Sequence, residues 1–253
     1  MDSDPMLPRS VVLALWLQGV GDTSSAVKSV QGEDEPHEVY GLPGFPDGTD
    51  LDTLVTLWTT GPREACALLP APGDAAGVPA PATHAATESG ECVAVTTPAG
   101  SWAAVPRVTA FGSHLERGYL VRWDVVDVPT WSTQLLGAIG SLSDAERELR
   151  TSLVRATEAL DALDVARWRD DAADAIERLR HTHTGSWPVP QLDGRRARVL
   201  DLAARLRAIV ALGTADDGGA VNTWQVDQRS TALREVDRTA RHAMSAATFG
   251  AIR

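Results

Sequence analysis

The residues best suited to bind a ligand lie in and just after a proline-rich stretch, Pro70–Pro81. This stretch holds four prolines and two glycines, a composition that prevents regular secondary structure. We predict a strand before it and a helix after it. In open parallel sheets, ligands bind at this end of the strands, where a helix N-terminus also attracts anions. The candidate ligand-binding residues are Gly73, Asp74, Gly77 and His84.

The same stretch lacks the motifs that would identify such a ligand. Its glycines do not follow the Gly-x-Gly-x-x-Gly spacing of a dinucleotide site, and it lacks the Gly-Lys-Ser/Thr ending of a phosphate-binding loop. A rigid connection between two elements, held by its prolines, is therefore the simpler interpretation.

A second candidate site is a cluster of arginines in the last quarter of the sequence. Arg195, Arg196 and Arg198 are the candidates for binding an anion such as phosphate. The simpler interpretation is that the cluster contacts the acidic first half of the same chain. Residues 1–130 hold 17 acidic and 6 basic side chains, whereas residues 131–253 hold 17 of each. The acidic half also argues against nucleic acid or an anionic membrane as a partner.

The sequence shows no motif for catalysis or for a metal site. No Gly-x-Ser-x-Gly nucleophile motif is present, and the pair His181 and His183 lacks the further ligands that zinc needs. Cys66 and Cys92 lie in apolar runs, as expected of reduced thiols in a core. We therefore predict no metal and no cofactor, and we name no catalytic residue.

The beginning of the sequence predicts a soluble, cytoplasmic protein. Its first residues are acidic, whereas a secretion signal begins with basic ones. The apolar run Val11–Leu17 is too short to span a membrane.

Strands and helices alternate in the first half of the sequence, which predicts an α/β domain over residues 1–130. The apolar run Ser10–Leu17, bounded by Pro8 and Gly19, predicts a buried strand. The alternation favours a mostly parallel sheet with helices packed against it. The last two strands form an antiparallel hairpin at one edge, where Pro106 is best tolerated. The further predicted strands are Glu38–Tyr40, Ala65–Leu69, Glu91–Thr96, Trp102–Val108 and Gly118–Val128, and the predicted helices are Asp22–Gln31, Leu51–Thr60 and Ala82–Ser89.

Residues 131–253 are predicted to form a helical domain, a bundle of about four helices. Ser143 and Glu146 make a capping box at the start of the first helix, which ends at Leu163. A shift in the phase of the apolar stripe then predicts a second helix over Val165–Leu179. Because no Gly or Pro forces a break there, a single bent helix is the alternative.

The last two predicted helices form a tightly connected antiparallel pair. The first begins at Arg195, carries a broad apolar stripe that includes Leu206, and ends at Gly213. Asn222 caps the second helix, which continues toward Arg253. Together with the first half, these helices predict an α+β protein overall.

Three strings of the sequence are distinctive in combination: Leu68–Pro81, Leu163–Trp168 and Ala215–Val221. Together they resemble an uncharacterised family of actinobacterial proteins. The resemblance extends over most of the chain and implies a cytoplasmic bacterial protein. It implies no activity, so no catalytic residue is transferred from it.

We therefore expect a non-enzymatic interaction or regulatory module that binds an unknown protein partner or a second copy of itself. The expectation rests on the missing catalytic spacings and on the balanced charges of the helical half, which suit docking. Two alternatives stay open. A small-molecule or nucleotide-handling enzyme would have its site over Pro70–Pro81, near the junction of the two halves. The other is a structural subunit of a homo-oligomer. An exposed apolar stripe on the helix Ser143–Leu163 would support either this subunit or the interaction module.

Overall fold

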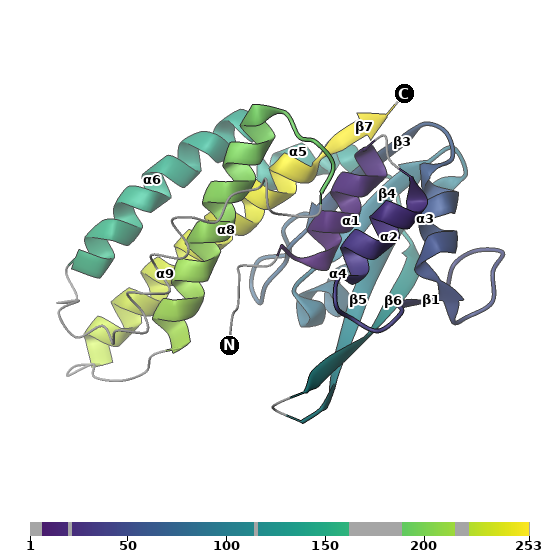
Figure 1. Cartoon of the computed structure of the whole chain (residues 1–253). Coiled ribbons are helices and arrows are strands. Elements are labelled where there is room, and N and C mark those ends of the chain that lie inside the picture. Colours follow the sequence, from purple (N-terminus) through teal and green to yellow (C-terminus); the bar gives the residue numbers. More distant parts are fainter. Residues whose placement is uncertain (1–6, 20–21, 114–115, 162–188, 216–222, 253) are drawn as a thin grey trace. The chain divides into compact units, whose positions relative to one another are not determined.

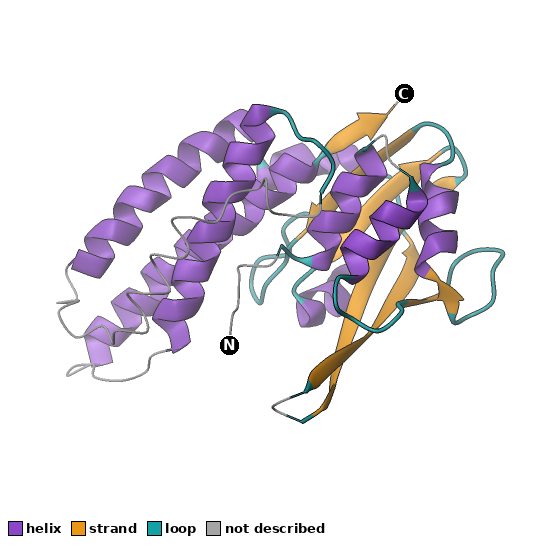
Figure 2. Ribbon diagram, in the orientation of Figure 1, coloured by secondary structure: helices purple, strands orange, loops and turns teal. Residues whose placement is uncertain are grey.

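The computed structural model of this chain describes residues 7–19, 22–113, 116–161, 189–215 and 223–252. Its contacts divide the chain into two compact units. The sheet unit is formed by the described residues of 8–139, together with residues 189–192 and 248–252. The helical unit is formed by residues 7, 140–161, 193–215 and 223–247. Helices and strands both contribute, so the fold is α+β overall (Figure 1, Figure 2).

Among the described residues, the sheet unit contains all the strands and the shorter helices. Its helices are α1 (Arg9–Gln18), α2 (Thr23–Gln31), α3 (Leu51–Thr59), α4 (Ala80–Ser89) and α5 (Ser132–Ile139). Its strands are β1 (Glu38–Tyr40), β2 (Thr49–Asp50), β3 (Arg63–Leu68), β4 (Cys92–Thr97), β5 (Gly100–Gly112), β6 (Arg117–Asp127) and β7 (Gly250–Ile252).

The seven strands form one sheet in the order β2-β1-β6-β5-β4-β3-β7. Neighbouring strands are antiparallel in every pair except β1 and β6, which are parallel. The prediction of a mostly parallel sheet was therefore wrong. The pair β3 and β4 shows why: α4 separates them in sequence, but the two strands are antiparallel neighbours, so α4 is not a crossover between parallel strands.

The run Ser10–Leu17, predicted as a strand, forms most of helix α1. All of its residues except Trp16 are buried, and the helix packs on β3 and β4. A run that is apolar on nearly every side shows neither the helical nor the strand period, so the sequence pattern does not separate the two structures. Pro8 precedes the helix at a position where a missing amide hydrogen costs nothing.

The other predicted helices of the first half are confirmed. Asp22 accepts a hydrogen bond from the amide of Ser25, and Asp50 accepts one from the amide of Thr53, both at 2.8 Å. Helix α4 ends at Gly90, whose φ of 78° is the left-handed conformation that glycine adopts readily. The predicted strands at β1, β3, β4, β5 and β6 are also confirmed, but the β5–β6 hairpin lies in the middle of the sheet and not at the predicted edge. β2, α5 and β7 were not predicted.

The helical unit contains α6 (Leu142–Asp161), α8 (Gly194–Ala215) and α9 (Thr223–Thr248) among its described residues. The predicted bundle of about four helices is not supported. The helix expected over Val165–Leu179 lies outside the described residues, and so does the predicted cap Asn222. None of the described helices combines the length and the apolar character needed to cross a membrane.

Two details of these helices differ from the prediction. The capping box of α6 consists of Ser141 and Asp144 instead of Ser143 and Glu146. The Ser141 hydroxyl accepts a hydrogen bond from the Asp144 amide, and the Asp144 carboxylate accepts one from the Ser141 amide. Helix α8 continues past Gly213, because a glycine inside a helix costs only about 1 kcal/mol, which packing can offset.

The buried faces of α8 and α9 agree with the predicted apolar stripes, except that Leu202 and Ile209 of the α8 stripe are only half-buried. Leu206 is fully buried in the middle of α8. The other buried apolar residues of the two predicted stripes are Val199, Leu200, Ala203 and Val210 on α8, and Leu233, Val236, Ala240, Met244 and Ala247 on α9.

Candidate functional site

The loop between β3 and α4 contains three of the four predicted ligand-binding residues. Asp74 closes a tight turn through two main-chain hydrogen bonds of 2.9 Å, and Gly73 in this turn has a φ of 84°. The Asp74 carboxylate also accepts a hydrogen bond from the amide of Ala76. Gly77 packs so closely on α5 that an added Cβ would lie 2.9 Å from Leu135. Asp74 and Gly77 therefore shape the loop itself.

The fourth predicted ligand-binding residue, His84, lies on α4 with 91% of its side chain exposed. Its Nε2 atom is 3.3 Å from the carboxylate of Glu88, one helical turn further along. The four residues thus have separate surroundings, and ligand binding by them stays a prediction.

The predicted anion-binding arginines lie at the start of α8. Arg195 donates a hydrogen bond of 2.8 Å to Glu146, and this contact is the main reason that the pKa of Glu146 is lowered. Arg196 lies 3.5 Å from the carboxylate of Asp193. These two partners belong to the helical unit, and the expected contact of the arginines with the acidic first half of the chain stays a prediction.

The third of these arginines, Arg198, is exposed at a groove of about 310 Å³ between α6 and α8. The groove is lined by Glu146, Leu149, Arg150, Arg198, Val199, Asp201, Leu202 and Arg205. Acidic and basic side chains both line the groove, so their charges partly cancel and the groove does not attract an anion strongly. Anion binding by these arginines stays a prediction.

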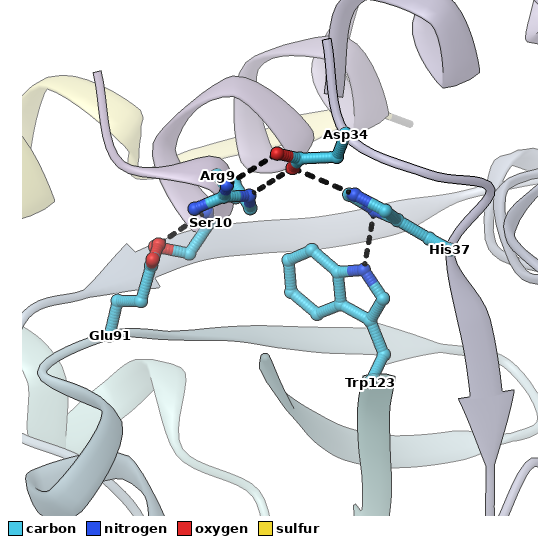
Figure 3. A network of polar contacts seen from close by, with 6 residues as sticks. All are labelled: Arg9, Ser10, Asp34, His37, Glu91 and Trp123. Carbon is cyan, nitrogen blue, oxygen red and sulfur yellow. Dashed lines mark hydrogen bonds and ion pairs between the residues drawn. The ribbon is translucent and has the colours of Figure 1, made fainter. Parts of the chain in front are cut away.

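A chain of buried polar side chains, which the sequence did not reveal, connects three parts of the sheet unit (Figure 3). Arg9 on α1 donates hydrogen bonds of 2.6 and 2.8 Å to the two carboxylate oxygens of Asp34. His37 Nε2 lies 3.1 Å from Asp34 Oδ2, and the indole N–H of Trp123 on β6 donates a hydrogen bond of 3.1 Å to His37 Nδ1. The His37 side chain is fully buried, and that of Asp34 is only 7% exposed.

These hydrogen bonds determine the protonation state of His37. An indole N–H only donates, so Nδ1 of His37 must carry the lone pair, and Nε2 carries the proton that points to Asp34. Burial lowers the pKa of His37, against the opposing effect of the Asp34 carboxylate. Burial opposes ionisation of Asp34, but the hydrogen bonds from Arg9 and His37 outweigh it and lower the pKa of Asp34. Since protein groups engage both ring nitrogens, His37 has no free lone pair for a substrate, and its role is structural.

Glu91 makes a further contact at the beginning of α1 (Figure 3). Its carboxylate accepts a hydrogen bond of 2.8 Å from the amide of Ser10 in the first turn. Pro8, at the position before the helix, provides no side-chain cap, so a residue just before β4 satisfies this amide instead. Together with Arg9, this contact fixes the start of α1 on the sheet.

The hairpin formed by β5 and β6 extends beyond its neighbouring strands (Figure 1). We refer to its far half, residues 107–112 and 117–120, as the arm. β4 pairs with β5 only as far as Ala104, and β1 pairs with β6 only over Arg122–Asp124, so neither strand flanks the arm. The arm carries exposed apolar side chains, which are Val108 (41% exposed), Phe111 (42%) and Leu120 (51%).

Phe111 and Leu120 lie on the same face of the arm. The register places Phe111 opposite Gly118 and Thr109 opposite Leu120, and directly opposed side chains share a face. The Phe111 ring covers Gly118, because a Cβ added at that glycine would overlap the ring. An aromatic ring over a cross-strand glycine restores packing that the glycine cannot provide.

The two edges of the arm differ. On the β6 edge, the carbonyl of Tyr119 accepts a hydrogen bond of 3.0 Å from the amide of Glu35, and the guanidinium of Arg9 lies 5.9 Å from the centre of the Tyr119 ring. On the β5 edge, no described strand pairs with residues 107–112. The arm therefore combines exposed apolar side chains with a strand edge whose main chain is open.

Both cysteines are buried and unbonded to each other, as predicted. Burial raises the pKa of the Cys92 thiol, so this thiol stays protonated and a poor nucleophile at neutral pH. In the described part of the chain, no three His, Cys, Asp or Glu side chains are arranged to hold a metal ion.

Comparison with protein families matches residues 10–135 to the N-terminal domain, and residues 143–245 to the C-terminal domain, of Rv1486c-like proteins. The chain belongs to the Rv1486c-like family. This family is uncharacterised and named after a mycobacterial protein, so membership assigns no activity. The resemblance to an uncharacterised family, inferred from the sequence, is confirmed. No curated protein and no solved structure matches the chain.

Proposed function

We propose that this protein is a non-enzymatic interaction module that binds another polypeptide through the arm. The observation that carries the proposal is the presence of exposed apolar side chains and an open strand edge on the same hairpin. Proteins usually protect such edges, because an open edge pairs readily with other chains. Strand addition to an exposed edge is a common way of binding an extended segment, with main-chain bonds giving affinity and side chains giving specificity.

The residues at the base of the arm also suit a protein interface. Arg122 lies on the same face as Leu120, and its guanidinium stands 4.7 Å above the centre of the Tyr40 ring. Arg122 and Arg107 both lie 2.7 Å from the carboxylate of Asp124, which holds their guanidinium groups in place. Arginine and tyrosine are enriched in the residues that dominate binding energies, and rigid side chains lose less entropy when a partner binds.

The alternative of an enzyme with its site over Pro70–Pro81 has less support. In the described part of the chain, Asp74 is used to close a turn of this loop and His84 is exposed on α4. The most deeply buried acid–base pair, Asp34 and His37, is engaged with Arg9 and Trp123. No observation in the loop favours a particular substrate.

We also propose that the protein acts in the bacterial cytoplasm. The support is the presence of two buried cysteines that form no disulfide, since unpaired thiols are typical of proteins in a reducing compartment. The membership in a family named after a mycobacterial protein agrees with a bacterial setting.

The test is site-specific photo-crosslinking in cells of the protein's own organism. Phe111 is replaced by p-benzoylphenylalanine, and Phe45, which has the same 42% exposure but lies outside the arm, is replaced in a control. We expect a discrete crosslinked adduct from position 111 and not from position 45. A second substitution on the same face, Leu120→Asp, should remove the adduct from position 111, because a charge cannot be buried against an apolar partner.

Two outcomes would contradict the proposed function. One is the absence of any adduct from position 111, on protein that is folded. The other is the same set of adducts from positions 111 and 45, which would indicate random collisions with exposed rings.

A further inference from the structure

The open edge of the arm is short and has defined ends. Pro106 lies just beyond the last residue that β4 pairs, and it has no amide hydrogen to donate. At the other end, Gly112 has a φ of 83°, so the extended strand stops there. The edge available to a new strand therefore comprises the five residues Arg107–Phe111, with Thr109 at its centre.

The direction of the main-chain groups follows from the contacts around this edge. Successive residues of an antiparallel strand point their N–H and C=O groups to opposite sides. The Ser101 carbonyl accepts a hydrogen bond from the amide of Val128, just beyond β6, so it points to the β6 side of β5. The Pro106 carbonyl accepts a hydrogen bond from the Ser89 hydroxyl, on the opposite side of β5. The odd-numbered residues of β5 therefore point to β6, and the even-numbered residues Val108 and Ala110 point to the open edge.

We propose that the arm binds a second copy of this chain, through antiparallel pairing of the two β5 edges about a twofold axis at Thr109. In this register, Val108 of each copy lies opposite Ala110 of the other. The two residues exchange both main-chain hydrogen bonds in each such pair, so all four outward N–H and C=O groups of each edge are used. This inference rests on the proposed function, because both require the arm to be the binding surface.

The side chains support pairing of the edge with itself. Thr109 lies opposite Thr109 of the second copy, and threonine pairs are favourable across strands. Val108 lies opposite the small side chain of Ala110, which avoids a clash. Arg107, the one charged residue of this edge, lies opposite Phe111 of the second copy, so the pairing places no two cations opposite each other.

The small size of the contact sets the expected strength. A five-residue strand pair buries far less than the roughly 1,200–2,000 Å² of a stable protein interface. We therefore expect a weak dimer, with a dissociation constant above about 10 μM. The dimer should be seen by sedimentation equilibrium at high protein concentration and should dissociate on dilution.

Disulfide trapping tests the register directly. Residues on the axis are a pair without hydrogen bonds between them, with Cα atoms about 4.5 Å apart, which a disulfide can bridge. Under mild oxidation, the Thr109→Cys protein should form a covalent dimer about tenfold faster than the control Ala99→Cys, at another exposed position that lies outside the arm. The native thiols at Cys66 and Cys92 are buried and should not compete. Ala110→Cys should not crosslink, since the two copies of residue 110 are diagonal to each other and too far apart.

A proline substitution tests the main-chain bonds. Ala110→Pro removes an N–H that points to the open edge and keeps the β5–β6 bonds within the chain, because those use the odd-numbered residues. It should weaken the dimer by at least about tenfold, since each dimer loses two main-chain hydrogen bonds. Circular dichroism shows whether the Ala110→Pro variant is folded. If this variant is unfolded, disulfide trapping of Thr109→Cys still tests the dimer.

The outcomes separate this inference from the proposed function. A monomer at every concentration, with Thr109→Cys trapped no faster than Ala99→Cys, overturns the dimer. A dimer that Ala110→Pro does not weaken also overturns it, since the interface then lies elsewhere. If the purified protein is monomeric but Phe111 crosslinks to a different protein, the second copy is excluded and the proposed function stands. If position 111 yields no adduct of any mass, the proposed function fails as well.

Discussion

The indole N–H of Trp123 on β6 donates a hydrogen bond of 3.1 Å to Nδ1 of His37, although the two residues lie far apart in sequence. The bond requires a lone pair on Nδ1, so it forms only with a neutral imidazole. Protonation of His37 would place two donor hydrogens against each other inside the core. Burial also opposes protonation, because a buried cation loses its hydration, and it lowers the pKa of His37 from its ordinary 6.5.

This relationship predicts a loss of stability in mild acid. The pKa of His37 is lower in the folded protein than in the unfolded chain, so the unfolded chain binds the additional proton. The stability from neutral His37 is therefore complete above pH 6.5 and is lost as the pH falls from 6.5 toward the lowered folded value. For one proton, the free energy of unfolding changes by at most about 1.4 kcal/mol per pH unit. Urea denaturation between about pH 7.5 and pH 5 measures it, above the range in which carboxylates titrate.

The control for this prediction is His37→Gln. A glutamine amide can accept from one side and donate to the other, but it does not titrate. The variant should lose the dependence on pH between 7.5 and 5 that we assign to His37. If wild type and variant show the same dependence in this range, other groups cause it and our assignment is wrong.

We expect that removing the ion pair between Arg9 and Asp34 lowers the stability of the protein strongly. Asp34→Ala leaves the Arg9 guanidinium, which is only 18% exposed, without its carboxylate partner. An unpaired charge held out of water is costly, so we expect a loss of about 3 kcal/mol in the free energy of unfolding. Urea denaturation at neutral pH measures this loss.

An exposed ion pair provides the comparison. Arg147 is 69% exposed and lies 2.6 Å from Asp144, so Arg147→Ala should leave the free energy of unfolding nearly unchanged. Equal effects of Asp34→Ala and Arg147→Ala would show that the Arg9–Asp34 contact is not maintained in solution.

Many of the helices and strands could be predicted from the sequence, because residues close to one another in the chain determine where they begin and end. The caps Asp22 and Asp50 act within three residues of themselves, and Gly90 ends a helix by its own conformation. In β6, Val121, Trp123 and Val125 are buried while Arg122 between them is exposed, which is the alternation expected of a strand with one covered face.

The errors concern features that depend on distant parts of the chain. Ser10–Leu17 is uniformly apolar, and its helical form reflects packing on β3 and β4 that the run itself does not encode. Arg9, Asp34, His37 and Trp123 follow no spacing that marks a shared site, so their network was missed. The arm was missed because the alternation in β5 and β6 predicts strands but does not tell where β4 and β1 cease to flank them.

The core of the helical unit predicts the effect of Leu206→Ala. Leu206 is fully buried on α8, so the substitution removes apolar contacts and leaves a cavity. We expect a loss of about 2–5 kcal/mol in the free energy of unfolding, measured with urea. Val154→Ala on α6, at a side chain that is 56% exposed, should cost less than about 0.5 kcal/mol. A loss below about 1 kcal/mol for Leu206→Ala would mean that α8 does not form the core of this unit.

The packing of Phe111 on Gly118 predicts a signature in solution. A ring that covers a glycine shields its Cα protons, so the Gly118 resonances should be shifted upfield in the NMR spectrum, and Phe111→Leu should abolish this shift. Gly118→Ala pushes the ring away and should speed hydrogen exchange of the arm amides, because no described strand flanks the arm on either edge. Combined with Phe111→Leu, the alanine should have little further effect, since the two residues stabilise the arm through one shared contact. Phe45→Leu, at an equally exposed ring, should leave the arm unchanged. Gly118 resonances that do not move in Phe111→Leu would show that the ring does not cover the glycine.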